Sequence, residues 1–284
     1  MPTEVYACQG IEAPLPAASG SWLESTACSI GLGGHPTVAE VHRAHATSIP
    51  FENLNPRRGI PASLAVEDLQ QKLVAERRGG YCFEHNLLLA AALEALGAEV
   101  GLLLARVRLG ADPGVTRPRT HLLLRVATDG ELLHADVGFG LGTPLEPLPF
   151  GPGAEHDQSG WRFRVVEDGP ELVLQTADGD EWLDLYGFLA QPVPMVDVET
   201  SNWFTSTHPR SPFVSGLSVG TQELDGTRAW LSDWNGLALA VQTPADTTVT
   251  PMALEDVPQL LAERFGLAGF VLDDGAQLVP ADSR

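Results

Sequence analysis

The spacing of apolar residues changes from a helical to a strand-like period about one third of the way along the chain. Before this change, apolar positions at helical spacing predict three helices, at residues 37–46, 66–77 and 82–96. The third is apolar on nearly every side and ends at Gly97, which suits the position after a helix C-terminus. We therefore expect it to be the central helix of an N-terminal bundle. Residues 1–35 are rich in Pro, Gly and Ser and are expected to be irregular, apart from a short helix at 22–28.

After Gly97, short apolar runs alternate with turn sequences. The runs predict strands at residues 100–109, 120–127, 132–137, 161–167 and 171–177. Asp-Gly pairs between them have hairpin chemistry, so the strands are expected to form an antiparallel meander or barrel. A Pro-rich linker at 191–194 leads to a mixed part with strands at 214–219 and 230–234 and a helix at 254–265. We predict an α+β chain of three units: helices at 1–97, a β-barrel at 98–190 and a C-terminal unit at 191–284.

Composition and charge exclude several classes of protein. A chain of 284 residues that is 44% hydrophobic and 19% charged can bury a core, which excludes disorder, collagen and a coiled coil. The net charge of −20 repels phosphate backbones and anionic lipid, so neither nucleic acid nor a membrane surface is an expected partner. No apolar run is long enough to span a membrane and no signal peptide pattern opens the chain, so we expect a cytoplasmic protein.

The three cysteines, Cys8, Cys28 and Cys82, contain no CxxC pair and fit a reducing compartment without disulfides. Cys82 follows Gly79 and Gly80 and begins the central helix, where free backbone N–H groups and the helix dipole favour the thiolate. The two glycines also let a substrate carbonyl approach the sulfur, while N–H groups at the turn receive the developing oxyanion. Cys82 is therefore a candidate nucleophile, although a small buried cysteine also fits this position.

A thiolate nucleophile needs a basic partner, and that partner needs an orienting acceptor. His121 and Asp136 lie on two consecutive predicted strands joined through an Asp-Gly turn, where cross-strand neighbours reach hydrogen-bond distance. His85 competes for the role of base because it is three residues from Cys82 on the same predicted helix. Cys82 and His85 also resemble half of a zinc site, but no second pair completes it, so no metal is expected.

Four segments resemble, in order and spacing, the arylamine N-acetyltransferases. Residues 78–86, Arg-Gly-Gly-Tyr-Cys-Phe-Glu-His-Asn, resemble the catalytic-cysteine signature of that family, and residues 49–54 resemble the stretch before it. Residues 119–121 resemble the histidine motif, and residues 136–140 resemble the aspartate motif. Residues 202–209 further resemble a C-terminal segment of the bacterial members, so the likeness covers essentially the whole chain.

This resemblance implies a Cys82, His121 and Asp136 triad on a papain-like fold of helical bundle, antiparallel β-barrel and α/β lid. It implies acetyl-CoA as the acyl donor, and an arylamine, a hydrazine or an arylhydroxylamine as the acceptor in a ping-pong scheme without metal. It also implies residues that contact the substrate or coenzyme A: Phe139 in the acceptor pocket, Trp203 and Phe204 near the pantetheine, and Gly138 and Thr120 beside the triad. Leu141 departs from the family pattern, because many relatives carry glycine at its position.

The net charge requires a local basic site for the phosphates of coenzyme A. Arg117 and Arg119, just before His121, are the candidates, and Arg106 and Arg108 lie on the preceding predicted strand. Three other functions remain open: a macrolactam-forming amide synthase, a papain- or transglutaminase-like thiol hydrolase, and a binding module with an inactive triad. The intact Cys, His and Asp motifs argue against the binding module.

Overall fold

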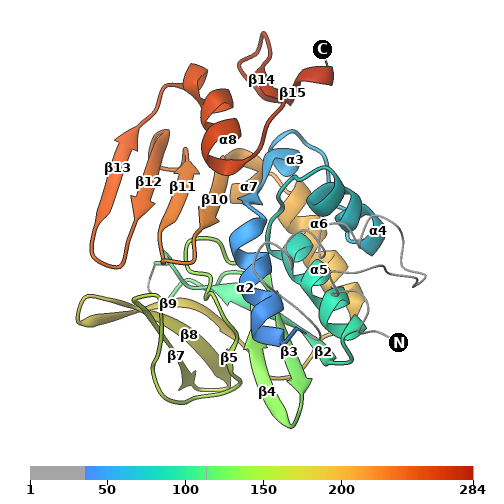
Figure 1. Cartoon of the computed structure of the whole chain (residues 1–284), viewed down its shortest axis with the longest axis vertical. Coiled ribbons are helices and arrows are strands. Elements are labelled where there is room, and N and C mark those ends of the chain that lie inside the picture. Colours follow the sequence, from blue (N-terminus) through green and yellow to red (C-terminus); the bar gives the residue numbers. More distant parts are fainter. Residues whose placement is uncertain (1–35, 113, 284) are drawn as a thin grey trace.

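The chain folds into N-terminal helices, a curled eight-stranded antiparallel sheet and a separate five-stranded sheet covered by a C-terminal helix (Figure 1). The computed structural model describes residues 36–112 and 114–283. The short helix expected at 22–28, Cys8 and Cys28 lie outside the described residues. The predicted α+β fold class is confirmed, and the strands that follow Gly97 pair antiparallel as the hairpin turns predict.

The N-terminal helices form where the apolar spacing predicts them, except for the short helix α3 (Leu54–Arg57), which was not predicted. The others are α2 (Val38–Ser48), α4 (Val66–Leu69), which continues as a π-helical turn over Gln70–Ala75, and α5 (Cys82–Ala95). A capping box begins α2, because the Thr37 side chain accepts from the Glu40 N–H and the Glu40 carboxylate accepts from the Thr37 N–H. Helix α5 is buried along most of its length and contacts α2, α4 and the barrel, as its apolar sequence predicts.

The barrel sheet has the strand order β5-β4-β3-β2-β9-β8-β7-β6, and its two edge strands do not pair with each other. Its members are β2 (Glu99–Val107), β3 (Arg119–Thr128), β4 (Glu131–Ala135), β5 (Leu148–Pro149), β6 (His156–Gln158), β7 (Trp161–Asp168), β8 (Glu171–Asp178) and β9 (Glu181–Phe188). Strand β3 lies between β2 and β4 and also contacts α5. This contact brings the histidine-bearing strand against the helix that begins at Cys82.

The second sheet pairs one strand from the N-terminal helical part with four strands from the C-terminal part. Its order is β1-β10-β11-β12-β13, from β1 (Phe51–Glu52), β10 (Ser218–Gln222), β11 (Arg228–Ser232), β12 (Ala238–Gln242) and β13 (Thr247–Pro251). Helix α8 (Val257–Phe265), preceded by a 3-10 turn at Leu254–Asp256, packs on this sheet. A hairpin of β14 (Phe270–Leu272) and β15 (Leu278–Pro280), then a 3-10 turn at Ala281–Ser283, ends the described chain. Because β1 pairs with β10, the segment before the nucleophile is part of the C-terminal sheet.

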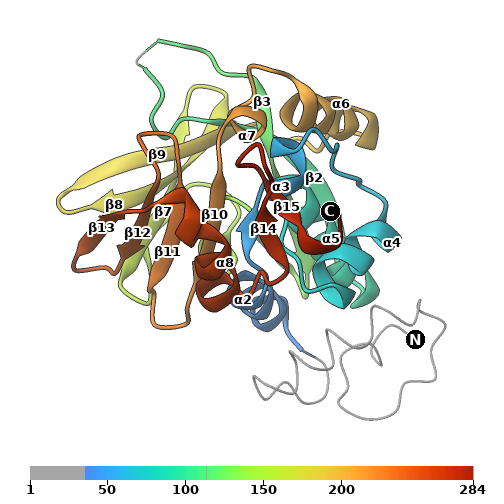
Figure 2. The same ribbon diagram turned by 90° about the horizontal axis from the view of Figure 1, so that it is seen from above.

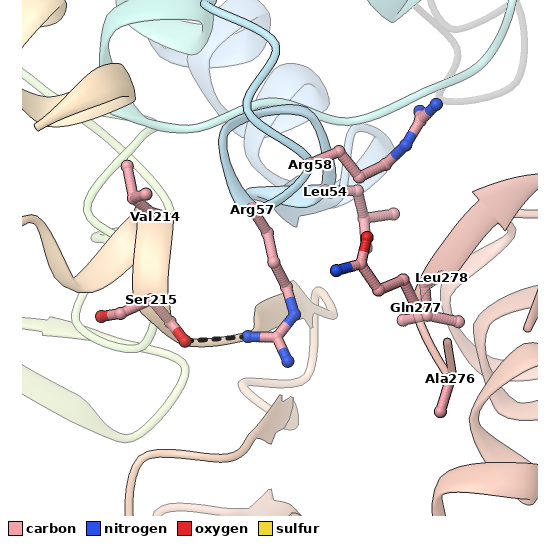
Figure 3. A pocket seen from close by; sticks show the side chains of 8 residues that line it. All are labelled: Leu54, Arg57, Arg58, Val214, Ser215, Ala276, Gln277 and Leu278. Carbon is pink, nitrogen blue, oxygen red and sulfur yellow. Dashed lines mark hydrogen bonds between the residues drawn. The ribbon is translucent and has the colours of Figure 1, made fainter. Parts of the chain in front are cut away.

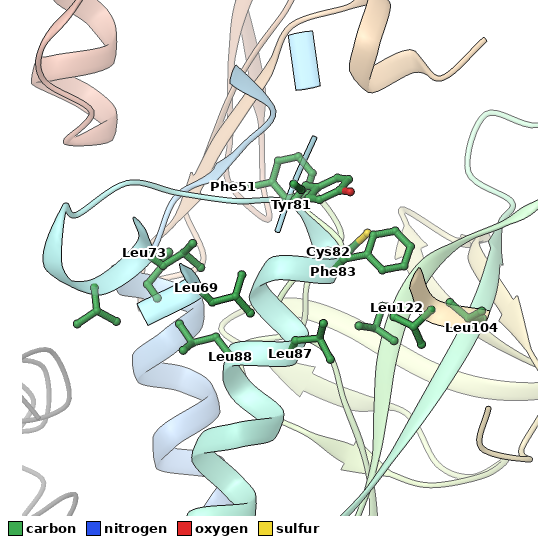
Figure 4. Close-up of a cluster of buried hydrophobic side chains, with 14 of the residues drawn as sticks. Phe51, Leu69, Leu73, Tyr81, Cys82, Phe83, Leu87, Leu88, Leu104 and Leu122 are labelled. Atoms are coloured by element: carbon green, nitrogen blue, oxygen red, sulfur yellow. The ribbon is translucent and has the colours of Figure 1, made fainter. Parts of the chain in front are cut away.

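Cys82 lies within one of the buried clusters of the protein. Figure 4 shows its sulfur beside the ring of Phe83 at the start of α5, with Phe51 and Tyr81 on one side and barrel leucines on the other. Trp230 from β11 also belongs to this cluster. The site therefore lies where the helices, the barrel and the second sheet meet. The unit boundaries at 97/98 and 190/191 stay a prediction.

Helix α6 (Met195–Thr207) is absent from the expectations above. Its buried residues include Asn202, Thr205 and Ser206, so its inward face is polar and the apolar spacing that signals a helix is missing. The Asn202 amide donates to the carbonyl of Ala62 (3.0 Å) and its oxygen accepts from the Tyr81 hydroxyl, which fixes α6 beside the nucleophile segment. Figure 2 shows α6 next to β3, and the two elements are in contact.

Two strand predictions are wrong in their bounds. The strand expected at 214–219 begins only at Ser218, because Pro212–Ser215 forms the short helix α7, which starts at the Ser211 cap. The strand expected at 230–234 is β11, which begins at Arg228 and ends at Ser232. Strand β9 was not predicted, because its burial changes from one-sided to two-sided along its length and no single period describes it.

Candidate active site

Cys82 is the first residue of α5 and only 3% exposed. Gly79 and Gly80 before it lie directly against the β1 segment: the Glu52 N–H donates to the Gly80 carbonyl (2.7 Å) and the Gly80 N–H to the Pro50 carbonyl (3.3 Å). A Cβ added at Gly79 would lie 2.1 Å from the Pro50 oxygen. The glycines are therefore required for the close approach of two backbones, which fixes the position where α5 begins.

Gly138, in the loop after barrel strand β4, also lies directly against the backbone of Cys82. A Cβ at this residue would lie 2.7 Å from the Cα of Cys82 and 2.9 Å from Nδ2 of Asn86. Its N–H also donates to Oδ1 of Asp136 (2.9 Å). The loop after β4 thus packs on the nucleophile backbone, and it places Asp136 within the reach of the residues around Cys82.

The structure brings Cys82, His121 and Asp136 together. Nε2 of His121 lies 2.7 Å from Oδ2 of Asp136, and the same ring is hydrogen-bonded to Cys82. Since Nε2 is used by Asp136, Nδ1 is the ring nitrogen that remains available to Cys82. The sulfur also lies 3.6 Å from the carbonyl oxygen of Thr120, to which the thiol donates. Thr120 therefore contacts the nucleophile through its backbone.

Asp136 is buried and accepts hydrogen bonds from four groups: His121 Nε2, the Tyr186 hydroxyl (2.7 Å), Asn86 Nδ2 (2.8 Å) and the Gly138 N–H (2.9 Å). Burial acts to raise the pKa of this carboxyl, but the charge of His121 and these donors outweigh burial and hold the pKa well below its usual range. Asp136 is therefore a carboxylate at neutral pH.

The protonation of His121 follows from the same ion pair. Burial acts to lower its pKa, but the charge and hydrogen bond of Asp136, together with the contact to Cys82, raise the pKa of His121 to about 10. An imidazolium is thus stable beside the sulfur at neutral pH. Such an imidazolium stabilises a thiolate and carries a proton that can be transferred to a leaving group.

Tyr186 and His134 extend the polar network beyond the triad. The Tyr186 hydroxyl donates to Asp136, so it accepts from Nε2 of His134 (2.7 Å). Burial lowers the pKa of His134 to about 4, which keeps this ring neutral. The sequence gives no signal for Tyr186, because it lies on the unpredicted strand β9.

His42 and Asn86 hold the backbone on either side of the aspartate. Nε2 of His42 accepts from the Asp136 N–H (3.1 Å), so its proton is on Nδ1, which donates to the Leu145 carbonyl (3.1 Å). Burial lowers the pKa of His42 to about 4. The Asn86 oxygen accepts from the Val137 N–H (3.1 Å). His42 is therefore more than a packing residue, and its role was not visible in the sequence.

His85, the competing base, faces away from this network. Its Nδ1 lies 3.0 Å from Nε2 of His45, and its Nε2 lies 3.2 Å from the Pro50 carbonyl oxygen. Burial lowers the pKa of His85 to about 4. Both ring nitrogens thus bond to groups outside the triad, although His85 is only three residues from Cys82 on the same helix.

Aromatic residues expected near the substrates lie at different distances from the triad. The ring of Phe139 is nearly perpendicular to that of His121, with 5.1 Å between the centroids, so Phe139 packs directly on His121. Trp203 on α6 is 62% exposed, and Phe204 stacks on His208 with centroids 4.6 Å apart. Leu141 is partly buried against the cluster around Cys82.

The four arginines considered for phosphate binding have different partners. Arg108 is held by Asp168 (2.7 Å), Glu171 (2.8 Å) and Asp184 (3.1 Å), and Nε of Arg106 lies 3.8 Å from Glu171. The Arg117 guanidinium donates to the carbonyls of Leu109 and Gly110 in its own loop. Nε of Arg119, in contrast, is buried without a hydrogen-bond partner. Of the four, Arg119 retains the most free donor capacity.

Other features of the described residues lie outside this network. A cavity of about 230 Å³ between α3, α7 and the β14–β15 hairpin is lined by Arg57, Arg58 and Gln277 but by no triad residue (Figure 3). No group of three or more His, Cys, Asp and Glu side chains within residues 36–112 and 114–283 is placed to hold a metal ion. In the same residues, no helix has both the length and the apolar character needed to cross a membrane.

A cysteine, a histidine and an aspartate in this order and geometry define a thiol enzyme of the acyl-transfer class. Comparisons with known proteins narrow this class. A family model described as N-acetyltransferase matches residues 36–269. An arylamine N-acetyltransferase of Mycolicibacterium smegmatis is 44% identical over 200 residues, which cover 67% of this chain and 72% of that protein.

A second relative is the arylamine N-acetyltransferase / N-hydroxyarylamine O-acetyltransferase of Salmonella typhimurium, 33% identical over 82% of this chain and 84% of its own length. Among solved structures, the Mycobacterium marinum arylamine N-acetyltransferase in complex with CoA matches with a TM-score of 0.77 and 38% identity, covering 81% of this chain and 85% of that one. The chain belongs to the arylamine N-acetyltransferase family, whose members are acyltransferases.

Proposed function

We propose that the protein transfers the acetyl group of acetyl-CoA to the nitrogen of arylamines and hydrazines, and to the oxygen of N-hydroxyarylamines, through an acetyl-Cys82 intermediate. The observation that carries this proposal is the buried chain of hydrogen bonds from Cys82 through His121 to Asp136. The arylamine N-acetyltransferase and N-hydroxyarylamine O-acetyltransferase activities of the relatives support arylamines and N-hydroxyarylamines as acceptors, and the CoA complex of the Mycobacterium marinum protein supports the donor.

In the first half-reaction, the Cys82 thiolate attacks the thioester carbonyl carbon of acetyl-CoA. The carbonyl oxygen takes up the negative charge, and free N–H groups in the first turn of α5 are the proposed donors to it. Collapse of the tetrahedral intermediate breaks the bond between the carbonyl carbon and the coenzyme sulfur. The His121 imidazolium gives its Nδ1 proton to that sulfur, so coenzyme A leaves as the thiol and His121 becomes neutral.

In the second half-reaction, the lone pair of the acceptor nitrogen attacks the carbonyl carbon of acetyl-Cys82. An arylamine is unprotonated at neutral pH, so no proton has to be removed before the attack. Neutral His121 takes the proton that the nitrogen loses as the amide forms, and the Cys82 thiolate departs. The imidazolium and thiolate are restored, with Asp136 holding the ring in one tautomer throughout.

The test is the acetylation of an arylamine by wild type, by Cys82→Ala and by iodoacetamide-treated enzyme. Both modified forms are expected to lose transfer while keeping the melting temperature within a few degrees. Transfer that persists after complete alkylation of Cys82 would show that the intermediate is wrong. p-Nitrophenyl acetate assayed with and without the arylamine separates a transferase from a thiol hydrolase, because only the transferase turns over faster when the amine is present.

The donor site is proposed to include Arg119 as a contact for the phosphates of coenzyme A, because no described residue accepts a hydrogen bond from its Nε. Arg119→Ala is expected to raise the KM for acetyl-CoA about tenfold and to leave p-nitrophenyl acetate, which has no phosphate, unchanged. Arg117→Ala is the matched control, since its guanidinium is occupied by loop carbonyls. Equal damage with both donors would mean that Arg119 supports the fold or the triad instead.

Acceptor and pantetheine contacts are also part of the proposal. Phe139 is proposed to form a wall of the acceptor pocket, because its ring lies on His121. Trp203 and Phe204 on α6 are proposed to contact the pantetheine, since α6 packs beside β3 next to Thr120. Gly138 is proposed to act through the close approach to Cys82 described above.

A further inference from the structure

Arg228, at the start of β11, is a buried arginine without a counter-ion. It is 4% exposed, and it forms no ion pair with any described residue. Its guanidinium carbon lies 3.9 Å from the ring centroid of Trp161 and 5.9 Å from that of Phe163. One nitrogen makes a long contact to the Thr143 carbonyl (3.4 Å), and Nε has no hydrogen-bond partner. Burial lowers the pKa of Arg228 to about 9, so the group is still charged at neutral pH.

A small, partly open cavity of about 20 Å³ lies beside this side chain. It is lined by residues of α2, β1, α5, the loop after Asp136, and strands β10 and β11, among them Gln222, Arg228, Trp230, Gly140 and Thr143. A cavity of this size holds one water molecule or one ion of similar radius. None of the residues that line it belongs to the proposed triad.

The polar groups that line the cavity are able to donate. Gln222 pairs with Arg228 across β10 and β11, so both side chains lie on the same face of the sheet. Oε1 of Gln222 is buried without a partner, and rotation of the amide presents its NH₂ group at the same place. The Thr143 hydroxyl accepts from the Gly140 N–H (2.9 Å), which leaves its own hydrogen to donate. The cavity therefore offers a guanidinium, an amide and a hydroxyl but no carboxylate.

A buried cation without a counter-charge is costly, because burial removes its hydration without replacing it. The stacking of Arg228 on Trp161 offsets part of this cost and leaves the N–H of Nε without a hydrogen bond. Water in the cavity would satisfy a hydrogen bond but not the charge. A small anion would do both.

We propose that this cavity binds one chloride-sized monovalent anion, held by Arg228, Gln222 and Thr143. The bound ion bridges β10 and β11 to the loop that follows Asp136, and it stabilises the contact between the second sheet and the barrel. Trp230 on β11 also packs against this loop. Its ring lies so close to Gly140 that an added Cβ at Gly140 would lie 2.6 Å from the ring. The proposal does not depend on the acyl-transfer chemistry.

The test is the melting temperature of the full chain in sodium chloride, sodium bromide and sodium gluconate at one constant ionic strength. Gluconate is too large for the cavity. Wild type is expected to melt about 3 °C higher in chloride or bromide at ten times the dissociation constant, with a saturable dependence on the halide. Arg228→Met is expected to remove this dependence. Arg164→Met is the matched control, because Arg164 also lies over a tryptophan, Trp182 (4.0 Å), but has a partner in Gln175 (2.8 Å).

A melting temperature of wild type that does not change with the anion would overturn the proposal and indicate water in the cavity. The same result follows if Arg228→Met keeps the halide dependence of wild type. If Arg228→Met does not fold, bromide-soaked crystals of wild type decide the question. An anomalous peak within 3.5 Å of the Arg228 guanidinium is expected, and its absence at saturating bromide refutes the site.

Discussion

Replacing Asp136 by asparagine changes the charge and hydrogen bonding of the triad with little change in shape. Each carboxylate oxygen accepts from two donors: Oδ1 from Asn86 and Gly138, and Oδ2 from His121 and Tyr186. The amide NH₂ of Asp136→Asn must therefore face one of these pairs of donors. The less costly orientation is toward His121 and Tyr186, because a ring nitrogen and a hydroxyl can accept, whereas the Asn86 NH₂ and the Gly138 N–H cannot.

In this orientation, the amide donates to Nε2 of His121, and the ring proton moves to Nδ1. His121 then presents a hydrogen to Cys82 and has no free position to take its proton. The structure also gives the size of the effect, because the rise in the pKa of His121 from 6.5 to about 10 corresponds to about 5 kcal/mol. Asp136 supplies most of this stabilisation, so kcat for arylamine acetylation is expected to fall about 10³-fold.

The assay is steady-state acetylation of an arylamine, together with the rate of Cys82 alkylation by iodoacetamide between pH 5 and pH 10. The matched control is Tyr186→Phe, which removes one donor to the same oxygen but leaves the charge and the His121 tautomer unchanged. It is expected to lose less than tenfold in kcat. An Asp136→Asn enzyme that keeps a tenth of wild-type kcat, or a Tyr186→Phe enzyme that falls as far as Asp136→Asn, would refute the tautomer argument.

Two further predictions concern stability. Gly138→Ala is expected to lower kcat at least tenfold and the unfolding free energy by about 1–3 kcal/mol, because its Cβ would lie 2.7 Å from the Cα of Cys82. Gly153→Ala is the control, since nothing lies within 4 Å of its added Cβ, and equal effects of the two changes would contradict the reasoning. Acid is expected to destabilise the protein from pH 6.5 downward, by up to about 3 kcal/mol for each of the three histidines whose pKa burial lowers to about 4: His42, His85 and His134. Below pH 6.5 these three histidines become protonated in the unfolded chain but stay neutral in the folded protein, so the free energy of unfolding falls. His121 is protonated in both states over this range, because its pKa is raised in the folded protein, so its contribution to the free energy of unfolding is constant. Urea unfolding at pH 7, 6 and 5 measures this, and a constant midpoint would disprove it.

Helices α2 and α5 were predicted from the sequence and helix α6 was missed, and the difference has a physical cause. Helix α2 was predicted because its apolar residues recur at helical spacing after the N-cap Thr37, and α5 because a long apolar run ends at Gly97. Helix α6 was missed because its inward face is polar, with Asn202 bonded to Tyr81 and Ala62. The apolar pattern of a segment indicates which of its faces is buried and which is exposed to water. It gives no such signal where the buried face is polar and is held by specific hydrogen bonds.

The sequence by itself determined the local features of this protein: a cysteine at the start of an apolar helix, two glycines before it, and a histidine and an aspartate on neighbouring strands. The tertiary structure alone decided which histidine serves that cysteine. His85 is nearer in the chain but its ring bonds to His45 and Pro50, while His121 reaches Cys82 because β3 packs against α5. It also decided that Tyr186 and His42 support Asp136. Contacts between residues far apart in the chain depend on the packing of whole elements, and no local pattern of residues encodes that packing.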